Sequence, residues 1–278
     1  MSSATLSLGD VLRRASEHLG KTSETGRLDA ELLLAHALGR HRIDLYTDFD
    51  RPLSSHELDA YRDLVARRSR HEPVAYILGE WGFRRLTLTV DRRALIPRPE
   101  TEIVVERALR HLHGVEEPAV LDVGAGTGAI ALAIADEHPG AKVTAIDVSP
   151  DALELARENA ARTGLALELI HHDLRGGLPG GPYELVVANP PYVEPTDLAT
   201  LMPDVRDYEP HVALFGTGAT EAVARAATDV LSPGGHLVLE VGDGQATTTA
   251  AMLDGLGYGA VVTTPDLAGR DRVVEGRR

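Results

Sequence analysis

The amino-acid sequence predicts an α/β protein in which a small helical bundle and a β-hairpin linker precede a mostly parallel sheet with helices on both faces. Three changes of pattern along the 278 residues indicate this fold. Residues 1–80 carry apolar side chains at helical spacing, residues 81–99 alternate as strands do, and residues 100–278 alternate between strand-like and helix-like segments. Such alternation builds βαβ units, whose strands run parallel.

The helical bundle is predicted from apolar periodicity and from signals at the helix ends. The first helix ends at Gly20 and the second at Gly39, while the third begins at the capping-box pair Ser54 and Glu57. The apolar face of the second helix is expected to consist of Leu28, Leu32, Ala35 and Leu38.

The linker is predicted to be a hairpin. Leu86, Leu88 and Val90 alternate with threonines, which is the period of a half-buried strand. Pro97 and Pro99 stiffen the exit from this segment, because proline fixes the backbone angle φ.

The residues after the linker are predicted to form one sheet. Strands are expected at 119–124, 141–148, 166–173, 184–189 and 234–241. The connecting helices are expected near 127–138, 150–163, 217–231 and 244–255. A final pair of strands, 258–264 and 270–275, is expected to close the sheet edge.

Composition excludes several classes of protein. The chain has no cysteine, which rules out disulfides and cysteine nucleophiles and favours a reducing cytoplasm. Its N-terminal stretch lacks the apolar core of a signal peptide, and no run approaches the ~18 apolar residues of a membrane span. Residues 81–278 carry 17 Lys and Arg against 29 Asp and Glu, the wrong sign for an enzyme that wraps duplex DNA.

No metal is expected. The chain has 12 histidines, but their pairs lack the helical spacing and the nearby carboxylate that a zinc site requires. These pairs are His111 with His113 and His171 with His172.

A glycine-rich loop follows the first strand of the sheet and opens a helix. Its residues are Gly124, Ala125, Gly126, Thr127 and Gly128. Glycines let the backbone turn tightly and come close to a ligand, and Asp147 at the end of the next strand can hold a ribose. This pattern predicts an adenosine-bearing cofactor, with NAD and S-adenosylmethionine both open.

The third strand ends at Asp173 and Leu174, at the same edge of the sheet. Asp173 could accept a hydrogen bond from an adenine amino group, and Leu174 could cover a face of the ring. An ordinary solvated loop explains this spacing equally well, although its position at the cofactor edge favours the binding role.

The fourth strand runs into Asn189, Pro190, Pro191 and Tyr192. The Asn189 side-chain oxygen and the Pro190 carbonyl can hold both hydrogens of a planar NH₂ group and aim its lone pair at a methyl donor. Prolines preorganise these acceptors, and Tyr192 can lie on the flat face of the amide or base. Because no proton donor for hydride chemistry is evident, this tetrapeptide favours methyl transfer over a dehydrogenase.

These motifs resemble those of a known family, the bacterial peptide chain release factor glutamine N5-methyltransferases. The resemblance covers nearly the whole chain. Its phrases here are "RRSRHEPVAYILGEWGF", "LIPRPETE", "LDVGAGTGAIALAIA", "NPPYV", "DVRDYEPHVALFGTG" and "GRDRVVEGR".

The resemblance implies a Rossmann-like, seven-stranded class I methyltransferase domain at 100–278, a hairpin linker at 81–99 and a substrate-recognition domain at 1–80. It implies that Asn189 to Tyr192 hold the glutamine of the Gly-Gly-Gln motif in class I release factors. Contacts to S-adenosylmethionine are implied for Gly124 to Gly128, Asp147, Asp173, Leu174, Asn189 and Thr101. Many members have an aromatic residue where Leu174 stands, so adenine stacking is expected to be weaker here. A cytoplasmic monomer acting on protein, with no DNA or membrane partner, is expected.

Two charged clusters have several interpretations. The first, Arg67, Arg68, Arg70 and His71, is expected to be a solvated helix end, with contact to an acidic partner or ribosomal RNA as the alternative. The second follows the Asn-Pro-Pro-Tyr turn and could form a lid or simply pair ions at the surface. It consists of Asp204, Arg206, Asp207 and Glu209.

Three other functions remain open on sequence grounds. A DNA adenine-N6 methyltransferase shares the Asn-Pro-Pro-Tyr motif but must flip its base and bind phosphates. A non-catalytic cofactor-binding module could dock on the translation machinery through residues 1–80. A relative could also methylate a different protein or a small molecule.

Overall fold

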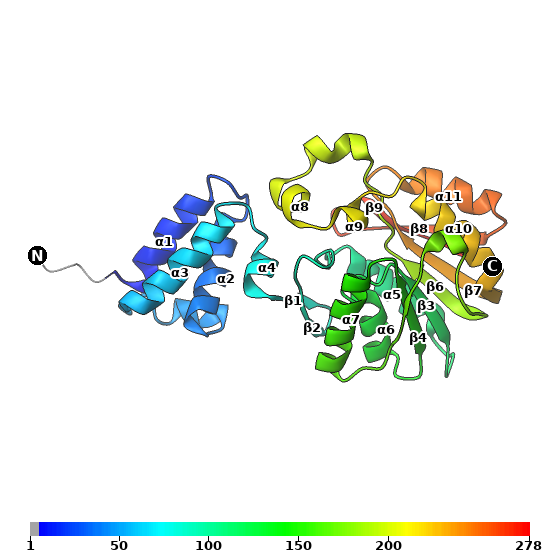
Figure 1. Cartoon of the computed structure of the whole chain (residues 1–278), viewed down its shortest axis with the longest axis horizontal. Coiled ribbons are helices and arrows are strands. Elements are labelled where there is room, and N and C mark those ends of the chain that lie inside the picture. The colour runs from blue at the N-terminus through cyan, green and yellow to red at the C-terminus, as the bar shows by residue number, and fades with distance from the viewer. Residues whose placement is uncertain (1–5) are drawn as a thin grey trace, which may run out of the picture. The chain divides into compact units, whose positions relative to one another are not determined.

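The computed structural model describes residues 6–278, so the first five residues of the predicted N-terminal domain lie outside the described residues. The chain divides into two compact units (Figure 1). Unit 1 runs to Gly79 and also contains Met202–Tyr208, whereas unit 2 consists of Glu80–Leu201 and Glu209–Arg278. Within the described residues, no helix is long and apolar enough to cross a membrane.

Unit 1 is helical, as predicted. Its elements are α1 (Leu8–Leu19), α2 (Gly26–Leu38), the 3₁₀ helix η1 (Arg42–Tyr46), α3 (Ser55–Arg68), α4 (Val74–Leu78) and α8 (Pro203–Tyr208). The predicted capping box is confirmed, because the Ser54 hydroxyl accepts from the Glu57 N–H and the Glu57 carboxylate accepts from the Ser54 N–H. Gly39 ends α2 in the left-handed conformation with φ 61°, which glycine adopts at little cost.

The buried face of α2 differs from the predicted one. Leu28 is exposed, and the buried stripe consists of Gly26, Asp29, Ala30, Glu31, Leu33, Leu34 and Ala35. The prediction is confirmed for Ala35 and wrong for Leu28. It placed only apolar residues inside, whereas Asp29 and Glu31 are buried. Asp29 is buried through an ion pair with Arg68, whose Nε lies 2.8 Å from Asp29 Oδ2.

Arg68 is accordingly not part of a solvated helix end. Its side chain is 8% exposed and also approaches Asp204 at 3.5 Å within the same unit. The solvated interpretation of the basic run was therefore wrong at this position. Arg67 pairs with Glu72 at 2.7 Å, and the Arg70 carbonyl accepts a hydrogen bond from the Tyr208 hydroxyl.

Unit 2 begins with the predicted hairpin, formed by β1 (Glu80–Phe83) and β2 (Leu86–Thr89) in antiparallel pairing. Phe83 and Leu88 are buried in the core of this unit, so the hairpin is fastened to the domain that follows.

Within residues 6–278 the main sheet has seven strands in the order β5-β4-β3-β6-β7-β9-β8. Its strands are β3 (Ala119–Val123), β4 (Lys142–Asp147), β5 (Glu168–His171), β6 (Tyr183–Ala188), β7 (Leu231–Glu240), β8 (Gly259–Pro265) and β9 (Asp271–Arg277). All neighbouring pairs from β5 to β7 are parallel, and β9 runs antiparallel to β7 and β8. The predicted fold class is confirmed.

Helices cover both faces of this sheet (Figure 1). One face packs against α5 (Thr101–Leu112), α6 (Ala129–Glu137) and α7 (Pro150–Thr163), and the other against α10 (Ala219–Val230) and α11 (Ala246–Gly255). The sequence pattern predicts no helix at α5. This helix starts directly after a proline-rich stretch and has no side-chain cap, so the usual start signal is missing.

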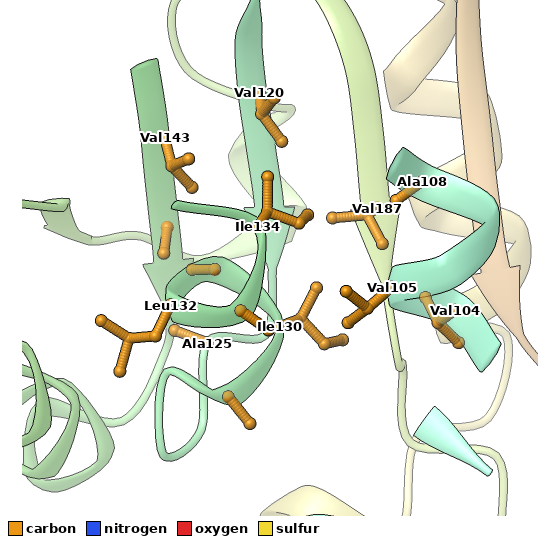
Figure 2. Close-up of a cluster of buried hydrophobic side chains, with 14 of the residues drawn as sticks. Val104, Val105, Ala108, Val120, Ala125, Ile130, Leu132, Ile134, Val143 and Val187 are labelled. Carbon is orange, nitrogen blue, oxygen red and sulfur yellow. The ribbon is translucent and has the colours of Figure 1, made fainter. Parts of the chain in front are cut away.

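The core forms because strand residues alternate between the two faces. Val120 and Val187 contribute to the cluster under α5 and α6, while their neighbours Leu121 and Val186 contribute to the cluster under α10 and α11. Figure 2 shows the first cluster, in which Ile134 of α6 lies among side chains of the sheet. The hydrophobic clusters on the two faces of the sheet hold the ends of the strands in fixed positions. The candidate site lies at these strand ends.

Candidate active site

A cavity of about 480 Å³ lies at the carboxyl ends of the parallel strands. The strand register explains why sequence-distant residues meet there. Val123 at the end of β3 pairs with both Ile146 of β4 and Ala188 of β6. The next residues along these strands, including Gly124, Asp147 and Asn189, therefore leave the sheet side by side and line the cavity. Here the chain connections diverge on either side of β3, which is where open α/β sheets bind ligands.

The glycine loop is held in place by backbone hydrogen bonds. The N–H groups of Gly124 and Ala125 both donate to the Ile146 carbonyl at 2.9 Å. Gly124 and Gly126 have φ angles of 88° and 53°, in the left-handed region that disfavours other residues. The loop thus presents backbone rather than side chains to the cavity.

Asp147 is oriented by two backbone donors. Its Oδ2 accepts from the Gly126 N–H at 2.9 Å, and its Oδ1 accepts from the Ser149 N–H at 2.8 Å. Each carboxylate oxygen has a second lone pair, so Asp147 retains acceptors for ligand hydroxyls. The contact with Gly126 also fixes the loop and the carboxylate relative to each other.

Asp173 and Leu174 also line the cavity, at the end of β5. Hydrogen bonds from the Arg175 side chain are the main cause that lowers the pKa of Asp173 to about 2. Asp173 therefore stays ionised across the neutral range. Leu174 begins the short 3₁₀ helix η2 (Leu174–Gly176).

The Asn-Pro-Pro-Tyr segment is only partly in the cavity. Among the described residues, the lining includes Asn189, Pro190 and Pro191 but not Tyr192. The Tyr192 hydroxyl instead donates to Glu240 Oε1 at 3.4 Å, and its carbonyl accepts from Gln245 Nε2 at 3.1 Å. The tetrapeptide is thus anchored at its far end by the loop after β7.

Glu240 and its link to Thr101 were not anticipated from the sequence. Thr101 Oγ1 donates to Glu240 Oε2 at 2.6 Å, and Asn189 Nδ2 donates to Thr101 Oγ1 at 3.3 Å. Burial raises the pKa of Glu240 to about 7. A signal was available, because the apolar strand "HLVLE" ends in a carboxylate at the same sheet edge as Asp147 and Asn189.

Hydrophobic residues that were not anticipated from the sequence also line the cavity. Ala94, Val212 and Phe215 line the cavity, together with Ile96. Phe215 is held edge-on by His211, with ring centroids 5.4 Å apart.

The acidic cluster after the Asn-Pro-Pro-Tyr turn is divided between the two units. Glu209 belongs to unit 2, where both of its oxygens bind Arg98 Nη2 at 2.8 and 2.6 Å. Its side chain is 1% exposed, and Arg98 lines the cavity. Asp204 pairs with Arg68 in unit 1, and Arg206 pairs with Asp207.

Three of the four histidines considered for metal binding contact other groups in the structure. His171 and His172 bond to the carbonyls of Val148 and Gly177. His111 stacks on His236 with centroids 3.8 Å apart and lies 3.2 Å from Glu275. Over residues 6–278, no group of three or more histidine or acidic side chains could hold a metal ion.

Asp122 of β3 is a second buried carboxyl group near the site. It is 1% exposed, and its Oδ2 accepts from the Ala131 N–H at 3.2 Å near the start of α6. Its Oδ1 has no hydrogen-bond partner among the described residues. Burial raises the pKa of Asp122 to about 8, with Asp147 adding to the rise.

The raised pKa values of Asp122 and Glu240 predict that stability falls as pH rises from about 4 to about 8. The unfolded chain releases these protons near their ordinary pKa values, whereas the folded chain retains them. Each group therefore destabilises the fold by up to roughly 1.4 kcal/mol per pH unit in this window. Urea unfolding of wild type and Asp122→Asn at about pH 5 and about pH 8 tests this, because the variant should lose less stability. Equal losses in both proteins would contradict the assignment to Asp122.

The strand order, the terminal antiparallel strand and the cavity beside the glycine loop and Asp147 define a class I, Rossmann-like methyltransferase. Comparisons with known proteins agree. Residues 10–79 match the model of the "PrmC N-terminal domain", and residues 102–203 match that of the "Methyltransferase small domain". The solved structure of a 16S rRNA N2 methyltransferase from Thermus thermophilus superposes with a TM-score of 0.53 at 20% identity, over 72% of this chain and 49% of that one, and supports the fold alone.

Curated relatives match along almost the whole chain. A release factor glutamine methyltransferase from Deinococcus radiodurans is 41% identical over 98% of this chain and 99% of its own. Another from Geobacter sulfurreducens is 44% identical, over 92% and 91%. The chain belongs to the family of release factor glutamine methyltransferases, which are S-adenosylmethionine-dependent enzymes.

Proposed function

We propose that this protein methylates the side-chain amide nitrogen (N5) of the glutamine in the Gly-Gly-Gln motif of class I peptide chain release factors. Family membership supports the substrate class. One structural observation carries the chemistry. Asn189 and Pro190 line the same cavity as the glycine loop and Asp147, so a planar amide and an adenosine-bearing cofactor can meet there.

The residues present fit S-adenosylmethionine. The cavity of about 480 Å³ is within the usual range for small-molecule sites. Asp147 has spare acceptors for the ribose hydroxyls, the loop from Gly124 to Gly128 permits close approach, and Leu174 can cover the adenine. Thr101 and Asp173 lie in the same lining. When bound, the cofactor supplies an electrophilic methyl group whose departure leaves a neutral thioether.

The protein's contribution to the reaction is to hold the substrate amide. Asn189 Oδ1 and the Pro190 carbonyl would accept its two hydrogens and direct the nitrogen lone pair into the cavity. Pro190 and Pro191 have fixed φ angles, so these acceptors are positioned before the substrate arrives. Because the leaving group is neutral, positioning and charge complementarity account for most of the rate, and no strong base is needed.

The cavity wall would exclude water from this amide. Ile96 and Phe215 line the same cavity as Asn189, and so does Arg98, which pairs with Glu209. Tyr192 was expected to cover the amide face. In the structure the Tyr192 hydroxyl contacts Glu240 instead. We propose that Tyr192 fixes the end of the tetrapeptide and reaches the substrate only from the edge of the cavity.

Replacing Asp147 with alanine is expected to weaken cofactor binding by about 1–3 kcal/mol, because a charged hydrogen-bond acceptor is lost. Isothermal titration with S-adenosylmethionine measures this change. Glu154→Ala serves as the control, since Glu154 is an exposed carboxylate on α7 outside the cavity lining. Equal affinities for both variants would remove Asp147 from the site.

We propose that the segments of the chain have different roles. Residues 1–80 recognise the body of the release factor, residues 81–99 form the linker, and residues 100–278 carry out the transfer. We further propose a monomer that acts in the cytoplasm without DNA. The absence of cysteine supports the cytoplasmic location, and the excess of acidic over basic residues in 81–278 supports the absence of DNA binding.

Peptide mapping tests the proposed function. Purified release factor and labelled S-adenosylmethionine are incubated with the enzyme, and the modified residue is identified by mass spectrometry. A release factor with alanine in place of the Gly-Gly-Gln glutamine is the control and should remain unlabelled. Label on another residue, or tight duplex binding at low salt in a gel-shift experiment, would overturn the proposal.

A further inference from the structure

A chain of hydrogen bonds joins the Asn189 side chain to Thr101 and Glu240. It links residues from three distant parts of unit 2. Asn189 follows β6, Thr101 is the first residue of α5, and Glu240 ends β7. Thr101 and Glu240 are 4% and 1% exposed, so they are shielded from water. The mechanism proposed above assigns no role to Glu240.

The direction of these bonds follows from the number of protons available. A threonine hydroxyl has one proton, and an ionised carboxylate can only accept. Thr101 therefore donates to Glu240 Oε2 across 2.6 Å, and its oxygen is left to accept from Asn189 Nδ2 at 3.3 Å. With its NH₂ group bound on this side, the Asn189 amide turns its oxygen the other way.

Glu240 also holds the other end of the tetrapeptide. Its Oε1 accepts from the Tyr192 hydroxyl at 3.4 Å. Gln245 Nε2 donates to the Tyr192 carbonyl at 3.1 Å, which fixes the same residue through its backbone. Side chains from β7 and the following loop thus restrain Asn189 and Tyr192 together.

We propose that Glu240, acting through Thr101, is a positioning residue that makes the Asn189 side chain offer its oxygen, and not its nitrogen, to the substrate amide. This inference rests on the proposed function. The substrate NH₂ group has only hydrogens to offer on that side, so an Asn189 amide in the opposite orientation would repel it.

The charge on Glu240 controls this orientation. A protonated Glu240 would donate to Thr101, and Thr101 would then donate its own proton to the Asn189 oxygen. The amide would turn over and present its NH₂ group to the substrate. Glu240 takes up one proton from solvent, which forms its O–H bond; the rest of the reversal is rotation of the Thr101 hydroxyl and of the Asn189 amide, with no further covalent change.

The surroundings of Glu240 place its titration near neutral pH. The pKa of Glu240 is raised to about 7, mainly by burial and also by the charge of Glu100 before α5. The hydroxyls of Thr101 and Tyr192 and the guanidinium of Arg272 on β9 oppose this rise. Arg272 and Arg98 are also the cations whose charges oppose the rise in the pKa of Tyr192, the other hydroxyl bound to Glu240. We therefore expect kcat to rise with pH through about 7.

Kinetics of matched variants test the relay. Glu240→Gln and Thr101→Val are each expected to lower kcat about 10- to 100-fold, because a misoriented group slows chemistry. Glu240 is not among the described residues that line the cavity, so Glu240→Gln should change KM and cofactor affinity little. Both variants should lose the decrease of kcat below about pH 7, which is the acid limb of the plot of kcat against pH. Thr101→Ser retains the hydroxyl and should restore kcat and the limb. The double variant should be no slower than the single variants, since both act through one chain of bonds.

Glu275→Gln is the matched control. Glu275, on β9, is another buried carboxylate of the same sheet; it is paired with Arg107 and has no hydrogen bond to Thr101, Asn189 or Tyr192 among those of the described residues. Its replacement should lower stability and leave the acid limb in place. Loss of the limb in this control as well would overturn the assignment to Glu240.

Nuclear magnetic resonance offers a readout that does not depend on activity. Asparagine occurs only at positions 159 and 189, so ¹⁵N-asparagine labelling gives two side-chain amide signals. The Asn189 signal should shift with pH around 7 in wild type and stay constant in Glu240→Gln. Asn159 is the internal control, because its NH₂ group donates to the Thr89 and Thr127 carbonyls, both at 3.0 Å.

The two proposals fail in different ways. Wild type that leaves the release factor glutamine unmodified overturns the proposed function, and the Asn189 titration then decides the relay alone. If wild type is active, an unchanged kcat profile in Glu240→Gln and Thr101→Val overturns the relay. A Thr101→Ser variant as slow as Thr101→Val does the same, because the hydroxyl would then not be the determinant.

Discussion

Asn189→Ala is expected to lower turnover at least about 100-fold while the cofactor still binds. Asn189 Oδ1 is one of the two acceptors proposed to fix the substrate amide. Without it, the amide nitrogen keeps its delocalised lone pair and its orientation toward the methyl donor is lost. Single-turnover kinetics with release factor measure the chemical step, and titration with S-adenosylmethionine measures binding separately.

The expected pattern separates positioning from binding. Because Asn189 lies at the end of the cavity shared with the substrate, cofactor affinity should change much less than turnover. Asp197→Ala is a suitable control, since Asp197 is an exposed residue in η3 (Pro195–Thr200) of the same loop. A variant within about threefold of wild-type turnover would show that Asn189 is not an acceptor for the reacting amide.

The main features of this site could be predicted because they lie at strand ends. In a parallel sheet, carboxyl ends meet at one edge, so the glycine loop, Asp147 and Asn189 could be placed together from the chain pattern alone. Leu174 and Asp173 followed by the same logic, and the structure brings all of them to one cavity. The positions of these residues follow from the path of the backbone and do not depend on contacts between particular side chains.

The missed features depend on side chains that are distant in sequence. Thr101 and Glu240 are 139 positions apart, and nothing local to either residue indicates their hydrogen bond. Glu240 also ends an apolar strand, where a carboxylate is expected at the surface rather than buried. Its burial requires a hydroxyl from α5, a helix that the pattern did not reveal.

The same reasoning explains the error in α2. Its stripe of Asp29, Leu33 and neighbouring residues has good helical spacing, but a charged residue lies within it. Apolar periodicity selected Leu28 instead, which the structure exposes. Buried charges require a partner, and Arg68 lies 39 positions away in the chain. A pattern that treats each helix separately cannot find such a pair.

Arg68→Ala is accordingly expected to be among the most destabilising single changes in unit 1, costing about 3–5 kcal/mol. The side chains of Arg68 and Asp29 are 8% and 6% exposed. Removing the guanidinium leaves Asp29 buried with only the hydroxyls of Ser23 and Thr25, each at 2.8 Å, to solvate its charge. Hydrogen bonds from Arg68 to Ser23 and to the Glu72 carbonyl would be lost as well.

Two further variants show whether burial is the cause. Arg62→Ala removes an exposed arginine of the same helix, whose pair with Asp59 should contribute at most about 1 kcal/mol. Arg68→Lys retains the charge but not the planar fork, and should lie between the two. Urea unfolding together with hydrogen exchange in α2 and α3 localises the effect to unit 1. If Arg68→Ala were no more destabilising than Arg62→Ala, the pair would contribute as a surface salt bridge does, and Asp29 would have to reach water once its partner is gone.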